Sequence, residues 1–150
     1  MVQGSFDDRD DARLHVKQWL RSHSPSEYTP QNLRRLAREL MDSDTEPVDH
    51  VRVAWRERVY GMVKGLVEFA GEELMHPQGG VPASLHRAHD ELAKAAALLP
   101  NRLGAAIRHL RNALDMLSAH PHSAKSTERA SIAANLALSM IGGSTERLAA

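Results

Sequence analysis

The sequence predicts an all-α fold, a helical bundle of about six helices. Its apolar residues recur at helical spacing in every structured segment, and no segment shows the alternation of a strand. Phe, Tyr and Trp make up only 4% of the 150 residues, whereas alanine and leucine, which favour helices, are abundant. Sheets prefer β-branched and aromatic residues, so composition points the same way.

The first two expected helices span residues 10–22 and 30–41. Acidic residues at the start of the first suit the positive end of the helix dipole, and a loop rich in serine and proline ends it. Thr29 is a candidate N-cap for the second, and Pro30 occupies the first helical position, where its missing N–H costs nothing. The apolar residues of this second helix follow the amphipathic template without a miss.

A long third helix is expected over residues 48–75, after an acidic loop at residues 42–47. Gly61 and Gly65 lie one turn apart in it, a spacing that lets a second helix approach closely. That motif specifies dimerisation mainly in membranes. We therefore interpret the two glycines as packing residues.

Three further helices are expected over residues 83–98, 102–119 and 127–141, and Gly142 and Gly143 should stop the last one. The connections are short, so neighbouring helices should pack antiparallel with their apolar stripes inward. The expected core joins the third helix to the later ones through Trp55, Val59, Val63, Leu66, Leu92, Leu103, Ile107, Leu110, Leu114 and Leu136.

Residues 1–150 are expected to form a single domain in two parts. Residues 47–150 would form the main part, a C-terminal four-helix bundle. Residues 1–46 would form an N-terminal helical hairpin that sits against it as an appendage, because two short helices bury too little surface to stand alone.

Composition excludes several function classes. The net charge is zero, whereas proteins that hold duplex DNA through its phosphates usually carry a basic excess, so no stable duplex DNA binding is expected. Transient contact with RNA stays open. The basic cluster of Arg34, Arg35 and Arg38 is diluted by Glu39 and Asp42, which favours a solvated helix face.

The sequence also bears on location. The chain has no cysteine for a disulfide, a thiolate metal site or a nucleophile. Its first residues lack the pattern of a signal peptide, and no apolar run approaches the roughly 18 residues that a membrane span needs. We therefore expect a cytoplasmic protein without a membrane segment.

Nine histidines raise the question of a metal site. His86 and His89 could share a helix face, and His120 and His122 flank a proline. Zinc sites need three or four converging ligands, and neither pair belongs to an HExxH pattern or has a carboxylate at the usual spacing. Surface histidines are the favoured interpretation, and we expect no metal and no cofactor.

Candidate catalytic residues lie around the fifth expected helix, in two overlapping patterns. Arg102 and His109 have the spacing Arg-x6-His, and seven residues are nearly two helical turns, so both side chains would project from one side. Arg111, Asn112 and His120 form the second pattern, in which an Arg-Asn pair precedes a histidine by a longer stretch.

These patterns resemble those of HEPN domains, in particular the C-terminal helical domains of bacterial abortive-infection proteins, over residues 85–142 at most. Catalytic HEPN domains carry an arginine, often followed by Asn or another polar residue, then four to six residues, then a histidine. The first pattern has this spacing, but Leu103 follows its arginine. The second keeps Arg-Asn, but its spacing is two residues longer and Pro121 stands where a glycine is often found.

The resemblance implies a module of a bacterial antiviral defence or toxin system that cleaves RNA without metal, at a site shared across a homodimer. An imidazole can move protons near neutral pH, and a guanidinium can bind the phosphate as its charge builds. We prefer Arg111 with His120 as the reacting pair, and Arg102 with His109 is the second choice.

A non-enzymatic helical protein–protein interaction module, a regulator or inhibitor with a protein partner, remains the alternative function. The two functions make different spatial demands. Catalysis needs an arginine and a histidine in one place, whereas a docking module should expose an apolar patch without converging polar groups.

Overall fold

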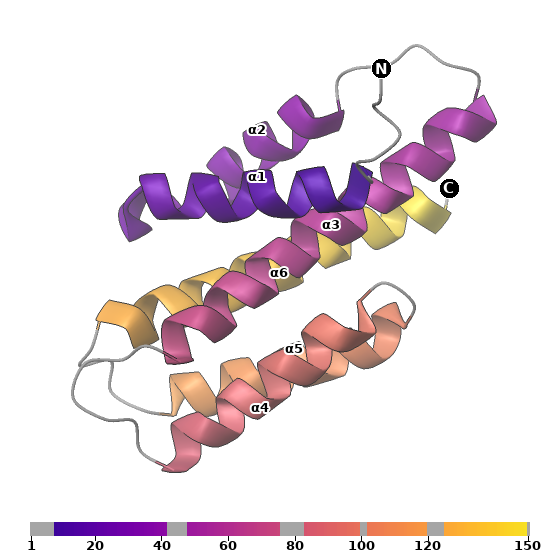
Figure 1. Ribbon diagram of the computed structural model, residues 1–150. Coiled ribbons are helices and arrows are strands. Elements are labelled where there is room, and N and C mark those ends of the chain that lie inside the picture. Colours follow the sequence, from indigo (N-terminus) through magenta and orange to yellow (C-terminus); the bar gives the residue numbers. More distant parts are fainter. Residues whose placement is uncertain (1–7, 42–47, 76–82, 100–101, 120–124, 150) are drawn as a thin grey trace.

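The computed structural model describes residues 8–41, 48–75, 83–99, 102–119 and 125–149. Within these ranges the chain forms six α-helices and one short 3-10 helix, and no strand is present. The elements are α1 (Asp8–Ser22), η2 (Pro25–Glu27), α2 (Pro30–Met41), α3 (Val48–Met75), α4 (Ala83–Leu98), α5 (Leu103–Ser118) and α6 (Lys125–Ala149), drawn in Figure 1. The predicted all-α helical bundle is confirmed. No helix in the described ranges has the length and apolar character to cross a bilayer.

The last helix differs from the expectation. α6 continues through Gly142 and Gly143 and ends only at Ala149, so the predicted glycine stop is wrong. A glycine weakens a helix interior by about 1 kcal/mol, whereas each added residue of a nucleated helix gains a hydrogen bond. Two glycines are therefore too weak a signal to end a helix that already packs along α3.

Helices α3 to α6 form a four-helix bundle in which each helix packs on its neighbour in sequence and α3 packs on α6. Successive helices run in opposite directions (Figure 1). Of the expected core, six side chains are buried: Val59, Val63, Leu66, Leu92, Leu110 and Leu136. The side chain of Trp55 lies outside the described residues.

Three expected core residues, Leu103, Ile107 and Leu114, are only partly buried. α5 packs less extensively on α6 than on α4, so part of its apolar stripe keeps some exposed surface.

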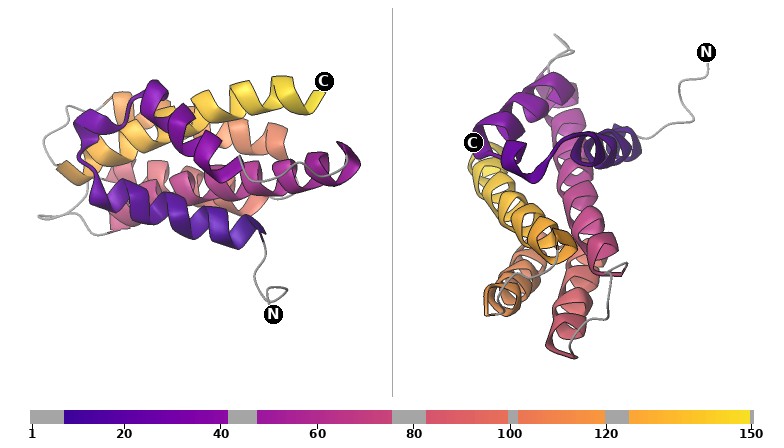
Figure 2. Two further views of the ribbon diagram at one scale, coloured as in Figure 1. Left: turned by 90° about the horizontal axis from the view of Figure 1, so that it is seen from above. Right: turned by 90° about the vertical axis from the view of Figure 1, so that its left-hand side faces the viewer.

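The two N-terminal helices share the core of the bundle but make little contact with each other. α1 lies along α3, and α2 contacts α3 and α6 (Figures 1 and 2). Side chains of both, including Val16, Leu20, Leu33 and Leu36, belong to the same buried cluster as the bundle. The two helices therefore do not pair as the hairpin that the sequence suggested. Each docks separately.

Gly65 allows α1 to approach α3 closely. A Cβ atom on Gly65 would lie 2.8 Å from the carbonyl oxygen of Arg13 and 3.3 Å from the Cβ of Val16. Real Cβ atoms do not approach backbone oxygens to 2.8 Å, so any side chain here would push the helices apart. Gly65 is thus a packing residue, as its spacing with Gly61 suggested.

Replacing Gly65 with alanine is expected to destabilise the fold by about 1–3 kcal/mol, the usual cost of overpacking a core. This cost should exceed the gain in helix propensity, which is about 1 kcal/mol. Gly104→Ala is the matched control, because a Cβ there would meet nothing within 4 Å. Urea unfolding of both variants measures the difference. A Gly65→Ala protein as stable as Gly104→Ala would contradict this role.

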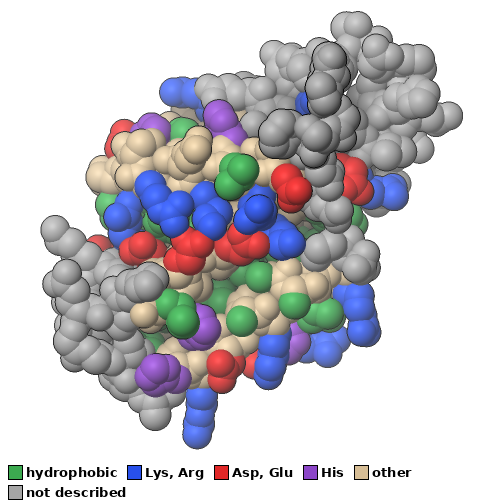
Figure 3. All heavy atoms as spheres, in the orientation of Figure 1, with side chains coloured by type: hydrophobic (Ala, Val, Ile, Leu, Met, Phe, Trp, Pro, Cys, Tyr) green, Lys and Arg blue, Asp and Glu red, His purple; other side chains and the backbone are tan. Residues whose placement is uncertain are grey.

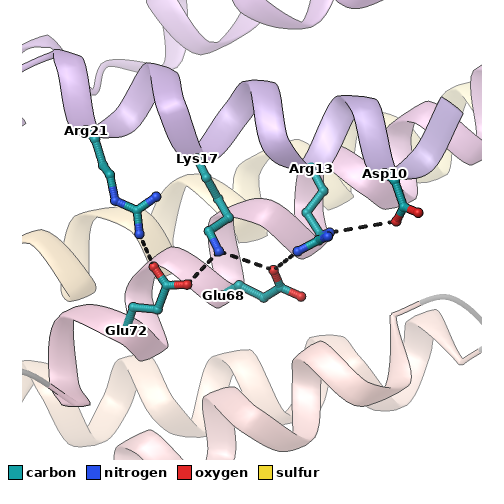
Figure 4. A network of polar contacts seen from close by, with 6 residues as sticks. All are labelled: Asp10, Arg13, Lys17, Arg21, Glu68 and Glu72. Atoms are coloured by element: carbon teal, nitrogen blue, oxygen red, sulfur yellow. Dashed lines mark hydrogen bonds and ion pairs between the residues drawn. The ribbon is translucent and has the colours of Figure 1, made fainter. Parts of the chain in front are cut away.

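An ion-pair ladder also joins α1 to α3 (Figure 4). Arg13 Nη1 lies 2.9 Å from Glu68 Oε1, Lys17 Nζ lies 2.5 Å from Glu72 Oε2, and Arg21 pairs with Glu72 as well. In each of the first two pairs the partners are 55 residues apart in sequence. Residue numbers therefore rise in the same direction along both helices, which means that α1 and α3 run parallel. Part-exposed pairs contribute little stability each, so the ladder mainly fixes the register. Figure 3 shows a row of Lys and Arg side chains beside a row of Asp and Glu side chains on this face of the molecule.

Arg129 of α6 binds the C-terminal end of α1. Its Nη2 donates hydrogen bonds to the carbonyl oxygens of Leu20 and His23, at 3.0 and 3.2 Å, and to the hydroxyl of Tyr28 at 2.9 Å. Its guanidinium carbon lies 5.5 Å from the centroid of the Phe69 ring. A cation at the C-terminal end of a helix also interacts favourably with the helix dipole.

Candidate functional site

The candidate site lies where α4 meets α5. Where the two helices meet, the Arg102 N–H donates a hydrogen bond to the carbonyl oxygen of Leu98 at 2.7 Å, so α5 begins beside the end of α4. They therefore run antiparallel, side by side (Figure 1). Both helices bury alanines at helical spacing, and small side chains permit close packing. These are Ala88 and Ala95 in α4, and Ala106 and Ala113 in α5.

Four polar side chains converge at the edge of this helix pair, and we call them the Glu91 cluster: Glu91, Lys94, His109 and Asn112. The Glu91 Oε1 atom lies 2.7 Å from His109 Nδ1 and accepts a hydrogen bond from Asn112 Nδ2 at 3.1 Å. The Glu91 Oε2 atom lies 3.6 Å from Lys94 Nζ. His109 and Asn112 are one turn apart on α5, so one carboxylate of α4 reaches both.

The carboxylate is the electrostatic centre of the cluster. The hydrogen bond with His109, helped by the Asn112 amide and the charge of Lys94, holds the pKa of Glu91 below its ordinary value and outweighs the opposing effect of burial. Glu91 is therefore ionised at neutral pH. An ionised carboxylate can only accept hydrogen bonds, so the facing Nδ1 of His109 carries the proton.

This arrangement orients His109 for proton transfer. With its proton on Nδ1, a neutral imidazole presents the lone pair of Nε2 as an acceptor. A histidine held by a carboxylate on one nitrogen and free on the other has the geometry of a general base. The His109 side chain keeps 25% of its surface exposed, against 15% for Glu91, so a substrate can reach the imidazole.

The structure thus joins two of the five residues predicted from sequence, His109 and Asn112, through a third that was not predicted. Arg111 is exposed, and two residues correspond to roughly 200° around a helix, so it points to the other side of α5 from His109. His120 lies outside the described residues.

Arg102 immediately precedes α5. Its carbonyl oxygen accepts the Ala106 N–H at 3.0 Å, which starts the helix. Its exposed side chain has no hydrogen bond or ion pair within the described ranges. Seven residues of helix rise by about 10 Å, which separates the start of α5 from His109.

Sequence reasoning missed Glu91 and Lys94. Their spacing on one helix is an ordinary surface pair, and nothing in α4 alone links it to a histidine of α5. A signal was nevertheless available. Counting outwards in both directions from the connection between the two helices places Glu91 opposite Leu110, between His109 and Asn112. Treating the two helices as an antiparallel pair would have found the contact.

Among the described residues, no group of three or more His, Asp or Glu side chains could hold a metal ion. A scan against protein-family models gave no match, and searches of curated proteins and of solved structures gave none either.

Proposed function

We propose that this protein is a helical module of a bacterial defence or toxin system, related to HEPN domains, and that it cleaves RNA without a metal ion through His109. The observation that supports this proposal is the 2.7 Å contact between His109 Nδ1 and Glu91, while Nε2 has no hydrogen bond to the described residues and can take a proton. The proposed base is then His109, from the pattern that was the second choice from sequence, in place of His120. Arg102 starts about 10 Å away along α5, so its guanidinium would contact the phosphate of the substrate and not the imidazole.

The reaction uses the 2′-hydroxyl of the substrate as nucleophile. Nε2 of His109 accepts the hydroxyl proton, the 2′-oxygen forms a bond to the adjacent phosphorus, and the bond from phosphorus to the 5′-oxygen breaks. The leaving oxygen takes up a proton from solvent. The products carry a 2′,3′-cyclic phosphate and a 5′-hydroxyl. A guanidinium such as that of Arg102 stabilises the charge that builds on the phosphate.

A relationship to HEPN domains would also imply a location and an oligomeric state. The protein would act in the cytoplasm as a homodimer, with parts of both subunits near the substrate. Arg111 would then be available at the outer surface of α5.

The alternative function, a docking module, finds less support. Apolar docking needs a contiguous exposed patch. The large exposed apolar side chains among the described residues are Leu14 and Met75, and these lie on two different helices. A convergent polar cluster is instead what the surface of α4 and α5 offers, so we place RNA cleavage first.

Incubation of the purified protein with end-labelled single-stranded RNA in the presence of EDTA tests the proposal. We expect fragments that end in a cyclic phosphate, and no cleavage of a substrate with 2′-deoxyribose at every position. Absence of cleavage of varied RNAs between about pH 5 and 8, where an imidazole titrates, would reject the proposed activity.

A further inference from the structure

We infer that the surface along α4 and α5 binds single-stranded RNA lengthwise, through a cation track formed by Arg87, Lys94 and Arg102 that flanks His109 on both sides. This inference rests on the proposed function, for which it names the substrate class and the residues that position the strand. It follows from the register of the two helices, which the Glu91 cluster fixes.

The α4 side of the track has a defined orientation. Arg87, Glu91 and Lys94 are spaced by four and three residues, so they lie on one face of the helix. Because Glu91 bonds to His109, that face is turned towards α5. Arg87 is exposed, and the Lys94 side chain is 59% exposed and only loosely paired, at 3.6 Å from Glu91. Both cations can therefore turn to a phosphate.

The α5 side extends the track. The hydrogen bond between the Arg102 N–H and the Leu98 carbonyl places Arg102 beside the last turn of α4. Since the helices are antiparallel, Lys94 and Arg102 lie on the side of His109 towards the end of α4, and Arg87 lies on the opposite side. From Arg87 to the end of α4 the helix rises by about 16 Å. The track therefore spans several phosphates, with the imidazole between its ends.

The charges of the track are less engaged than those of α1. Arg13, Lys17 and Arg21 of α1 are each paired with a carboxylate of α3. By contrast, the side chains of Arg87 and Arg102 have no hydrogen bond or ion pair in the described part of the chain. A cation that has no carboxylate partner to lose gains most from neutralising a phosphate, because binding then releases counterions at little cost.

The linear layout favours a single strand over a duplex. Proteins that bind single strands follow the backbone with a line of positive charge, whereas a duplex is recognised across its minor groove by contacts to both strands. The net charge of zero also leaves little long-range attraction for a duplex. A single strand is in addition flexible enough to bring its 2′-hydroxyl into line with the adjacent phosphorus.

Fluorescence anisotropy with a labelled 2′-O-methyl RNA oligonucleotide, which has no free 2′-hydroxyl to react, tests the track on the full chain. Arg87→Ala, Lys94→Ala and Arg102→Ala should each weaken binding several-fold. Each should also reduce the slope of log Kd against log salt by about 0.7, the value for one lost phosphate contact on a single strand. A duplex of the same sequence should bind more weakly than the single strand.

Arg34→Ala is the matched control. It removes the same charge from an exposed position on α2, which Figure 1 shows on the far side of α3 and α6 from α4 and α5. Its affinity and salt slope should equal those of the wild type. Equal weakening by Arg34→Ala, a preference for the duplex, or no binding by the wild type would each overturn the track.

The binding assay separates this inference from the proposed function, because it does not require cleavage. Track variants that lose affinity, together with a wild type that cleaves no RNA, would reject the catalytic proposal and retain the track. A wild type that cleaves RNA, with track variants of unchanged affinity, would reject the track alone.

Discussion

Replacing His109 with alanine should reduce the rate of RNA cleavage by about 10²–10⁴-fold, the range that a positioned acid–base group contributes. The variant removes the only group of the Glu91 cluster with a free nitrogen lone pair, and it should leave the helix content unchanged, since alanine favours helices. Rates measured from cyclic-phosphate product over time, with far-UV circular dichroism on the same samples, give the two readouts.

Two further variants, together with His120→Ala, make this result specific. His86→Ala removes an exposed histidine of α4 and should keep full activity. Glu91→Gln retains the shape of the side chain but loses the charge that holds the proton on His109 Nδ1, so it should lower the rate. Cleavage that depends on His120 but not on His109 would favour the pair of Arg111 with His120. Cleavage that survives both histidine replacements would rule out this mechanism.

Truncating Leu110 to alanine should lower the free energy of unfolding by about 2–5 kcal/mol. Leu110 lies in the middle of α5 and is completely buried. Truncation loses the free energy gained by moving the deleted side-chain atoms out of water. It also leaves a cavity that the neighbouring helices fill only in part. Urea denaturation followed by circular dichroism measures the loss.

Leu14→Ala is the control for this prediction, since the same truncation is made at a position that is 47% exposed on α1. Surface changes of this kind usually stay within about 0.5 kcal/mol. If the two variants unfold at the same urea concentration, the apolar stripe of α5 is not the centre of the core.

The sequence by itself determined the local structure of this protein. α2 begins at Pro30 as predicted, and the Asn32 N–H donates to the hydroxyl of Thr29 at 3.1 Å, so Thr29 caps the helix from the expected position. Caps, breakers and apolar stripes act between residues a few positions apart, and these signals are readable from a single chain. The buried faces of α3 and α4 followed from the same periodicity, whereas α5 buries Ala106 and Ala113 and leaves three of its predicted core residues partly exposed.

Only the tertiary structure decided which stripe packs on which, and in what register. A stripe of leucine and valine can cover any other stripe, because the hydrophobic effect has no direction. The pairing of α1 with α3 rather than α2 depends on the space at Gly65, and α6 continues past Gly142 although both of its glycines disfavour a helix. The Glu91 cluster depends on both helices at once. Its carboxylate and its imidazole lie 18 residues apart in sequence, and only the antiparallel register of α4 and α5 brings them to 2.7 Å.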